Sequence, residues 1–216
     1  MAPLLFIFTL KEEYYHLLWK LVRLWSKLLI YGMGFRLNIQ LDQVIEPGKS
    51  YMFCPNHGSL MDPFVLIVLS KNPIVFVGKQ ELVKIPIFGF FYKRAVIMVD
   101  RSSPESRKRV YERAKKRLQN GVSMAIFPEG LVPTEDVILA PFKKGAFHLA
   151  MEAGVPIIPI VIKNAYMAMP KGTSMFKPTH IEVVVLDPVD TSPWKVKNIN
   201  KHIEDVRELY LNELEN

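Results

Sequence analysis

Short apolar segments rich in β-branched residues alternate along this sequence with longer helical segments. Six of the apolar segments are SYMFC, IVFVG, AVIMV, SMAIF, PIIPIVI and IEVVVL, and FRLNIQL before them alternates polar and apolar residues with a period of two. The helical segments are DPFVLIVLS, SSPESRKRVYERAKKRLQNG, KKGAFHLAMEAG and NINKHIEDVRELYLNEL. Continuous apolar strands that alternate with helices predict an α/β fold, with a mixed, mostly parallel sheet flanked by helices.

The N-terminal residues 1–34 are predicted to form an amphipathic helical region that precedes a single domain at residues 35–216. At 3.6 residues per turn, apolar side chains share one side, namely Leu17, Leu18, Leu21, Leu24, Trp25, Leu28 and Leu29. The opposite side holds His16, Lys20, Arg23 and Lys27. Such a helix either packs on the domain with a solvated basic side or lies in a membrane interface, and we expect a membrane anchor. No segment reaches the roughly 18 apolar residues of a membrane-spanning helix.

The net charge of the chain indicates which classes of ligand it binds. The chain has 28 Lys and Arg against 21 Asp and Glu, a net charge of +7, which favours anionic partners such as nucleic acid, anionic lipid or a phosphorylated small molecule. The sequence shows neither an aromatic RNA-binding signature nor a basic recognition helix, so we expect no nucleic acid. A single Cys gives no disulfide framework.

The stretch CPNHGSLMDPF places His57 and Asp62 directly after a predicted strand. Residues five apart on a regular helix point about 140° apart. The pattern Ser59-x-x-Asp62, with Pro63 next, is typical of a capping box, so we expect a helix to begin at Ser59 and His57 to precede it. His57 could then fold back toward Asp62, as a general base and its orienting carboxylate do. The alternative is a plain strand–turn–helix connection.

Further polar residues follow later strands. Lys79, Arg94 and Arg101 surround apolar segments and suit a bound phosphate, with ordinary surface charge as the alternative. In FPEG, Glu129 and Gly130 sit at a strand end, with a simple turn as the alternative. Cys54 falls at the end of an apolar strand, and we favour a structural role over a nucleophilic one. No Gly-x-Ser-x-Gly motif indicates an α/β-hydrolase.

Four blocks occur in a fixed order: the His57–Asp62 motif, the segment from Lys79 to Arg101, FPEG and VPIIP. In these blocks, from about residue 50 to 190, the sequence resembles the PlsC-type glycerolipid acyltransferase family, which includes 1-acylglycerol-3-phosphate O-acyltransferases. The resemblance implies that His57 removes a proton from an acceptor hydroxyl while Asp62 orients it. It also implies acyl-CoA or acyl carrier protein (ACP) as cosubstrate, no metal or other cofactor, and lysophosphatidic acid and anionic phospholipids as membrane partners. Phosphatidic acid would form at the cytoplasmic face of the membrane, on a peripheral, monotopic protein.

The resemblance also implies a set of substrate-binding residues. Arg101 best matches the arginine that helps to hold the phosphate, and Glu129 and Gly130 help to shape the acceptor site. The full set expected to bind substrate is Asn56, Ser59, Lys79, Arg94, Arg101, Glu129, Gly130, Lys143 and Lys144.

One departure bears on the acceptor. The family often continues Thr-Arg-Ser after the glycine of the third block, where this chain has Leu131-Val132-Pro133. Either Lys143 or Lys144 substitutes for the missing arginine, or the acceptor is another lysolipid. Two other classes stay open. One is a non-catalytic module that binds anionic lipid, and the other is a metal hydrolase that uses His57, Asp62, Glu129 and His148.

Overall fold

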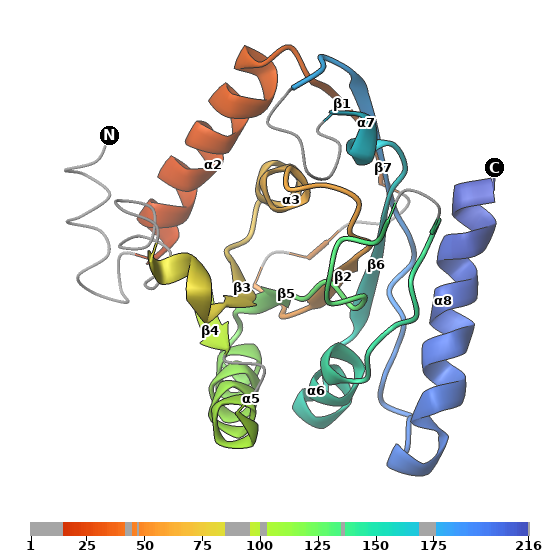
Figure 1. Cartoon of the computed structure of the whole chain (residues 1–216). Coiled ribbons are helices and arrows are strands. Elements are labelled where there is room, and N and C mark those ends of the chain that lie inside the picture. Colours follow the sequence, from red (N-terminus) through yellow and green to blue (C-terminus); the bar gives the residue numbers. More distant parts are fainter. Residues whose placement is uncertain are drawn as a thin grey trace.

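The computed structural model describes residues 15–41, 45–46, 48–84, 96–99, 103–134, 137–168 and 176–215. Its strands form a seven-stranded sheet in the order β1-β7-β6-β2-β5-β3-β4 (Figure 1). These are β1 (Arg36–Leu41), β2 (Met52–Pro55), β3 (Ile74–Lys79), β4 (Val96–Val99), β5 (Ser123–Ala125), β6 (Ile157–Ile162) and β7 (His180–Val185). Paired strands run parallel except β6 and β7, which are antiparallel. The predicted mixed, mostly parallel sheet is confirmed.

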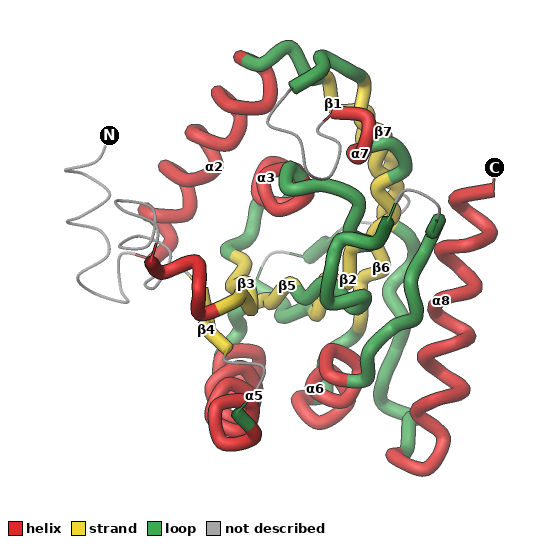
Figure 2. Tube along the Cα trace, in the orientation of Figure 1, coloured by secondary structure: helices red, strands yellow, loops and turns green. Residues whose placement is uncertain are grey.

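Helices cover both faces of this sheet (Figures 1 and 2). On one face lie α2 (Tyr15–Gly32), α3 (Asp62–Leu69) and α7 (Ala165–Ala168), and on the other lie α5 (Pro104–Gln119), α6 (Gly145–Ala153) and α8 (Ile199–Glu215). Two short 3₁₀ helices are η2 (Gln80–Lys84) and η3 (Val196–Asn198). The five longer helices were all predicted. The short α7, η2 and η3 were not, because a single turn shows no helical period.

The two faces of the sheet bury separate apolar clusters. Along β2, Phe53 packs in the cluster beneath α2 and α3, whereas Met52 and Cys54 pack in the cluster beneath α5, α6 and α8. Residues along β6 divide in the same way, with Ile158 and Ile160 on one side and Ile157 and Val161 on the other. Burial on both faces explains why these strands are apolar throughout instead of alternating.

Helix α5 begins and ends as its sequence predicts. The Ser103 side chain accepts a hydrogen bond from the Ser106 N–H at 3.1 Å, and Pro104 occupies the first turn. Two residues after Gln119, Gly121 adopts a φ of 85°, a left-handed conformation that suits glycine. Helix α5 therefore spans the gap between β4 and β5 and returns the chain to the same sheet.

Helix α2 packs on the domain mainly through residues outside the predicted apolar side. Trp19, Ser26 and Ile30 are buried, at 6%, 0% and 0% exposure, and Trp19 and Ile30 join the cluster of α3. The Arg23 guanidinium donates to the backbone carbonyl of Val68 at the end of α3, so Arg23 of the predicted basic side contacts the domain. A cation at a helix C-terminus is favoured by the exposed carbonyls there.

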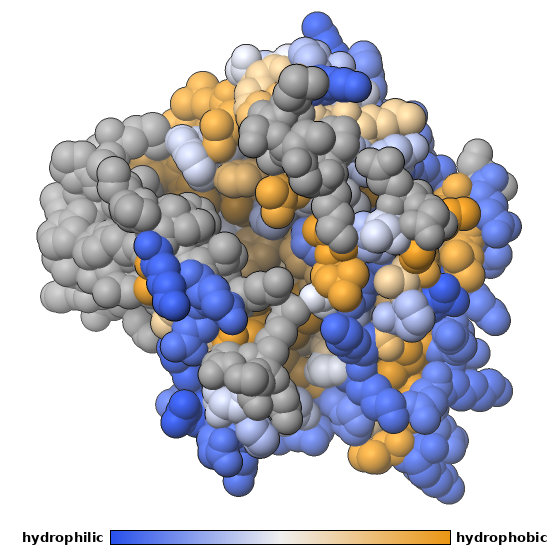
Figure 3. All heavy atoms as spheres, viewed as in Figure 1, coloured by the Kyte–Doolittle hydropathy of each residue, from blue (hydrophilic) through white to orange (hydrophobic). Residues whose placement is uncertain are grey.

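On the predicted apolar side of α2, Leu18 is buried and the Trp25 ring packs edge-on against Phe64 of α3, whereas Leu24 and Leu28 lie away from the packing surface. Leu24, Trp25, Leu28 and Tyr31 are 50%, 39%, 58% and 51% exposed, and we call them the outer face of α2. Figure 3 shows hydrophobic atoms along α2, while hydrophilic residues surround α5. Among the described helices, none has the length and apolarity needed to cross a bilayer. The membrane anchor and the boundary at residue 34 stay predictions.

Candidate active site

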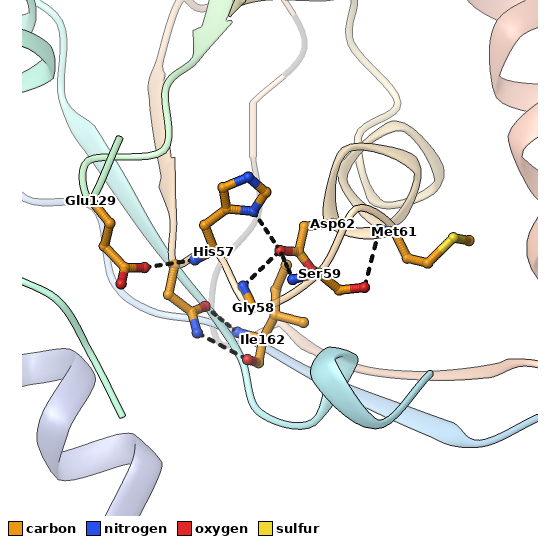
Figure 4. A network of polar contacts seen from close by, with 8 residues as sticks. His57, Gly58, Ser59, Met61, Asp62, Glu129 and Ile162 are labelled. Carbon is orange, nitrogen blue, oxygen red and sulfur yellow. Dashed lines mark hydrogen bonds and ion pairs between the residues drawn. The ribbon is translucent and has the colours of Figure 1, made fainter. Parts of the chain in front are cut away.

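The carboxyl ends of three adjacent strands bring the polar residues of the site together. Strands β6, β2 and β5 are neighbours and run parallel. His57 lies two residues after β2, and Glu129 lies in the turn that follows β5. Loops at this edge of an α/β sheet are where ligand sites usually form. Residues far apart in sequence thus surround the His57 turn (Figure 4).

His57 and Asp62 form the central pair of the site. Nδ1 of His57 lies 2.8 Å from Oδ2 of Asp62, and the Asp62 side chain is fully buried. The backbone N–H groups of Gly58 and Ser59 also donate to Oδ2, each at 2.8 Å. Because the carboxylate only accepts, the proton of a neutral ring sits on Nδ1 and leaves Nε2 as a base. Figure 4 shows that the other ring nitrogen points away from Asp62.

The turn achieves this contact through only half of the predicted capping box. Helix α3 begins at Asp62 and not at Ser59, and the side chain of its N-cap residue, Met61, makes no capping hydrogen bond. The Asp62 carboxylate reaches back to the Ser59 N–H as expected, but the Ser59 hydroxyl accepts from the Met61 N–H at 3.3 Å. The prediction of the helix start is wrong by three residues, because Ser59 forms a local turn and Pro63 then opens the helix.

Burial raises the pKa of Asp62, and the hydrogen bonds from His57, Ser59 and Gly58 oppose that rise. Oδ1 of Asp62 is buried without a hydrogen-bond partner in the described part of the chain. The donors to Asp62 therefore gather on Oδ2, beside the imidazole. A carboxylate held in this way can stabilise an imidazolium that forms next to it.

The Glu129 carboxylate connects the His57 turn to a second loop through two hydrogen bonds. Oε1 accepts from the His57 backbone N–H at 2.7 Å, and Oε2 accepts from the Ala140 N–H at 2.9 Å. The residue is 2% exposed, and burial raises the pKa of its carboxyl group. Sequence reasoning missed this contact, because 72 residues separate Glu129 from His57. Glu129 thus acts on the position of His57 from the opposite side to Asp62.

Phe127 supports the imidazole directly. The rings of Phe127 and His57 stack with centroids 4.1 Å apart and an interplanar angle of 26°. The aromatic ring precedes Glu129 by two residues, so one turn after β5 provides both contacts. Sequence reasoning did not assign Phe127 a role, although it stands in the FPEG block. Stacking restricts rotation of the imidazole about its side-chain bonds.

Asn56 and Ser59 make their described contacts with backbone groups. The Asn56 side chain accepts from the Ile162 N–H at 2.7 Å and donates to the Ile162 carbonyl at 3.0 Å. The amide thereby extends the pairing of β2 and β6 past Pro55, where the strand ends. Asn56 and Ser59 are 6% and 2% exposed. Both residues shape the His57 turn, and their contact with substrate stays a prediction.

The lysines and arginines that were predicted to bind phosphate lie in different parts of the structure. Lys143 lies across Gly130, since a Cβ atom at Gly130 would come within 2.7 Å of its Nζ. Lys144 is exposed and immediately precedes α6. Lys79 is the last residue of β3. Arg94 and Arg101 lie outside the described residues. Among the described side chains of the predicted phosphate-binding residues, that of Lys143 lies against the third block.

The contacts of Cys54, Asp62 and Glu129 bear on the two alternative chemistries, a cysteine nucleophile and a metal hydrolase. Cys54 is buried, which raises the pKa of its thiol and keeps the thiolate from forming. His57 and two backbone N–H groups occupy Oδ2 of Asp62, and backbone N–H groups occupy both oxygens of Glu129. The described residues contain no group of three or more His, Cys, Asp or Glu side chains placed to hold a metal ion. The structural role favoured for Cys54 agrees with its burial.

Sequence comparisons match this chain to one family model and to several proteins that carry the same name. Residues 36–163 match the family model described as Acyltransferase. The chain is 31% identical over 189 residues to a 1-acyl-sn-glycerol-3-phosphate acyltransferase of Limnanthes douglasii, covering 87% of this chain and 66% of that protein. It is 33% identical over 191 residues to the enzyme of the same name from Cocos nucifera, covering 88% and 61%. The chain therefore spans less than two thirds of the length of these relatives.

A solved structure shares the fold. The crystal structure of the 1-acyl-sn-glycerophosphate (LPA) acyltransferase PlsC from Thermotoga maritima superimposes with a TM-score of 0.82 at 24% sequence identity. The match covers 98% of this chain and 85% of that one. The arrangement of strands and helices is therefore common to the two proteins.

Proposed function

Given that the chain belongs to the acyltransferase family, which its match over residues 36–163 establishes, we propose that it acylates 1-acyl-sn-glycerol 3-phosphate to phosphatidic acid. The acyl group comes from a thioester, either acyl-CoA or acyl-ACP. The observation that supports this most is the 2.8 Å contact between His57 Nδ1 and Asp62 Oδ2, with the second ring nitrogen turned away. The names of similar proteins agree with the acceptor.

The transfer needs one base and one acid, and a single imidazole serves as both. Nε2 of His57 takes the proton of the acceptor hydroxyl as its oxygen attacks the thioester carbonyl. Asp62 stabilises the resulting imidazolium through Nδ1. When the tetrahedral intermediate collapses, the carbon–sulfur bond breaks, and His57 returns the proton to the thiolate. The products are an ester and a free thiol, and His57 ends the cycle neutral.

Positioning is the second requirement. Asp62 holds the ring of His57, Glu129 holds its backbone, and Phe127 stacks against the imidazole. Proximity and orientation of this kind account for a large share of the rate in acyl transfer, because the reactants lose little freedom at the moment of reaction. The site needs no metal for this step, since a thioester is already an activated acyl donor.

We place the protein at the cytoplasmic face of a membrane, bound peripherally through the outer face of α2. Leu24, Trp25, Leu28 and Tyr31 form an exposed apolar surface on a helix that also bears Lys20 and Lys27. Apolar and aromatic side chains beside cations favour the boundary between acyl chains and anionic headgroups. The inner side of α2 meanwhile fixes the helix to the domain through Trp19 and Ile30. A lipid acceptor and a soluble donor can both reach such a protein.

The test is a transfer assay with a defined set of substrates. Purified protein is incubated with acyl-CoA or acyl-ACP and with lysophosphatidic acid, lysophosphatidylcholine or a lyso-ornithine lipid, and products are identified by mass. We expect phosphatidic acid and one free thiol for each ester formed. A different acylated lysolipid as main product would reassign the acceptor. Binding to anionic vesicles without thiol release from either donor would identify a lipid-binding module instead of an enzyme.

A further inference from the structure

The ammonium group of Lys143 is held against the turn that contains Glu129. Gly130 has a φ of 73°, and a Cβ atom built on it would lie 2.7 Å from Nζ, 3.1 Å from Cε and 3.0 Å from Cδ of Lys143. The Lys143 side chain thus crosses the space that a side chain at position 130 would fill. Lys143 is exposed to solvent, and its ammonium group lies beside Gly130, the residue that follows Glu129.

Backbone contacts fix the segment that presents Lys143. The Lys143 N–H donates to the Pro128 carbonyl at 2.8 Å, and the Ala140 N–H donates to Glu129 Oε2 at 2.9 Å. Glu129 in turn accepts from the His57 N–H. A continuous series of contacts therefore leads from His57 through Glu129 and Gly130 to Lys143. These contacts fix the backbone of Lys143 relative to the turn that holds His57.

The two buried carboxyl groups near His57 make a nearby cation favourable for binding an anionic substrate. Asp62 and Glu129 are both buried carboxyl groups on either side of the His57 turn, and an anionic substrate approaching them is repelled in so far as they are ionised. Lys143 is exposed and forms no ion pair within the described part of the chain, so its charge is available to a ligand. Lysine commonly binds phosphate as a point charge.

We propose that Lys143 binds the phosphate of the acceptor lipid and thereby sets the preference for an acidic lysolipid. This inference rests on the proposed function. In 1-acylglycerol 3-phosphate, two carbons and one oxygen separate the reacting hydroxyl oxygen from phosphorus, so a hydroxyl at His57 places the phosphate close by. The phosphates of CoA lie at the far end of the pantetheine arm. Lys143 is therefore assigned to the acceptor and not to the donor.

The test compares three lysine variants. Lys143→Met keeps the aliphatic stem over Gly130 but removes the charge, Lys144→Met does the same one residue later, and Lys116→Met is the control on exposed α5. KM and kcat are measured for lysophosphatidic acid and monoacylglycerol as acceptors, with acyl-CoA as donor. We expect Lys143→Met to raise the KM for lysophosphatidic acid by about ten- to a hundred-fold, with kcat changed far less. The KM for monoacylglycerol should stay within about two-fold, and Lys143→Arg, which keeps the positive charge, should raise the KM for lysophosphatidic acid far less than Lys143→Met does.

Several outcomes would overturn the assignment while leaving the enzyme intact. They are an unchanged acceptor KM in Lys143→Met, an equal or larger effect in Lys144→Met, and a rise in the KM for acyl-CoA instead. Inhibition by glycerol 3-phosphate gives a second measurement, and its inhibition constant should rise in Lys143→Met alone. Melting curves check that each variant folds. If the wild-type protein transfers no acyl group to any acceptor, the proposed function itself fails, and this result is distinct from all of the others.

Discussion

Nδ1 of His57 lies 2.8 Å from Oδ2 of Asp62, although the two residues are five apart in sequence and would diverge on a continuous helix. The turn between them makes the contact possible. His57 lies two residues after the end of β2, whereas Asp62 is the first residue of α3, so the two side chains approach from opposite ends of a short loop. The same carboxylate oxygen accepts from the two backbone N–H groups inside that loop. Asp62 therefore shapes the turn and orients the imidazole at the same time.

Removing either member of this pair should stop transfer without unfolding the protein. We expect His57→Ala to lower kcat by about 10²- to 10⁴-fold, because the general base is lost. The variant should lose some stability but still fold, since the backbone contact to Glu129 and the two backbone N–H donors to Asp62 remain. Asp62→Asn should reduce kcat by a comparable factor, because the amide favours the wrong tautomer. Near-normal turnover in His57→Ala would refute the mechanism.

The buried carboxyl of Asp62 should give the fold a defined pH dependence. Its pKa is raised by burial, so the folded chain holds this proton more tightly than the unfolded chain does. By linkage, the contribution of this group to stability is full below its unfolded pKa of about 4 and is lost as the pH rises through the folded value. Urea unfolding of the wild type and Asp62→Asn from pH 4 to pH 8 tests this. The free energy of unfolding of the wild type should fall relative to the variant as the pH rises, and a relative gain would contradict it.

Glu129 should prove to be a positioning residue. In Glu129→Gln the new NH₂ group faces one of the two backbone N–H donors, so one of the hydrogen bonds to His57 and Ala140 is lost. We expect a loss of about 1–3 kcal/mol in the free energy of unfolding, together with a fall in kcat of about tenfold or more. The KM for the acceptor should change less than kcat does. The control is Glu208→Gln on the exposed side of α8, which should alter neither quantity.

Gly130 should tolerate no side chain. Its φ of 73° strains any L-residue, and an added Cβ would displace the end of Lys143. Gly130→Ala should therefore destabilise the fold by about 1–2 kcal/mol in urea unfolding and raise the KM for the acidic acceptor. Gly145→Ala offers a matched control, because a Cβ there meets no atom within 4 Å. Equal stabilities of the two variants would contradict the prediction.

Charges on the outer face of α2 should detach the protein from membranes. Leu24 and Leu28 are 50% and 58% exposed, so the double variant Leu24→Glu, Leu28→Glu should fold and melt as the wild type does. Its partition onto vesicles that contain anionic phospholipid should fall by about tenfold or more, because apolar burial is replaced by charge repulsion. Leu209→Glu places the same change on α8, where the leucine is 40% exposed, and should leave binding unaltered. Sedimentation with vesicles measures the membrane binding of the double variant and of Leu209→Glu.

Patterns that depend on near neighbours were predictable. The alternation of apolar strands with helices indicated the fold class, and Ser103, Pro104 and Gly121 marked the ends of α5. Each of these signals arises within a few residues of the position that it describes. The start of α3 was misplaced for the same reason, since Ser59 and Asp62 fit a capping box locally, whereas the turn uses only one of its two bonds.

The sequence by itself determined the kinds of elements, their order, and the presence of a His–Asp pair beside a strand end. The tertiary structure alone decided which partners meet. Glu129 reaches the His57 backbone only because β2 and β5 are neighbours in the sheet, and Lys143 lies over Gly130 only because two loops are hydrogen-bonded. Helix α2 has apolar residues on two sides, and α3 buries the one with Trp19 and Ile30. Helical periodicity locates an apolar side, but the choice between two such sides depends on the surface against which the helix packs.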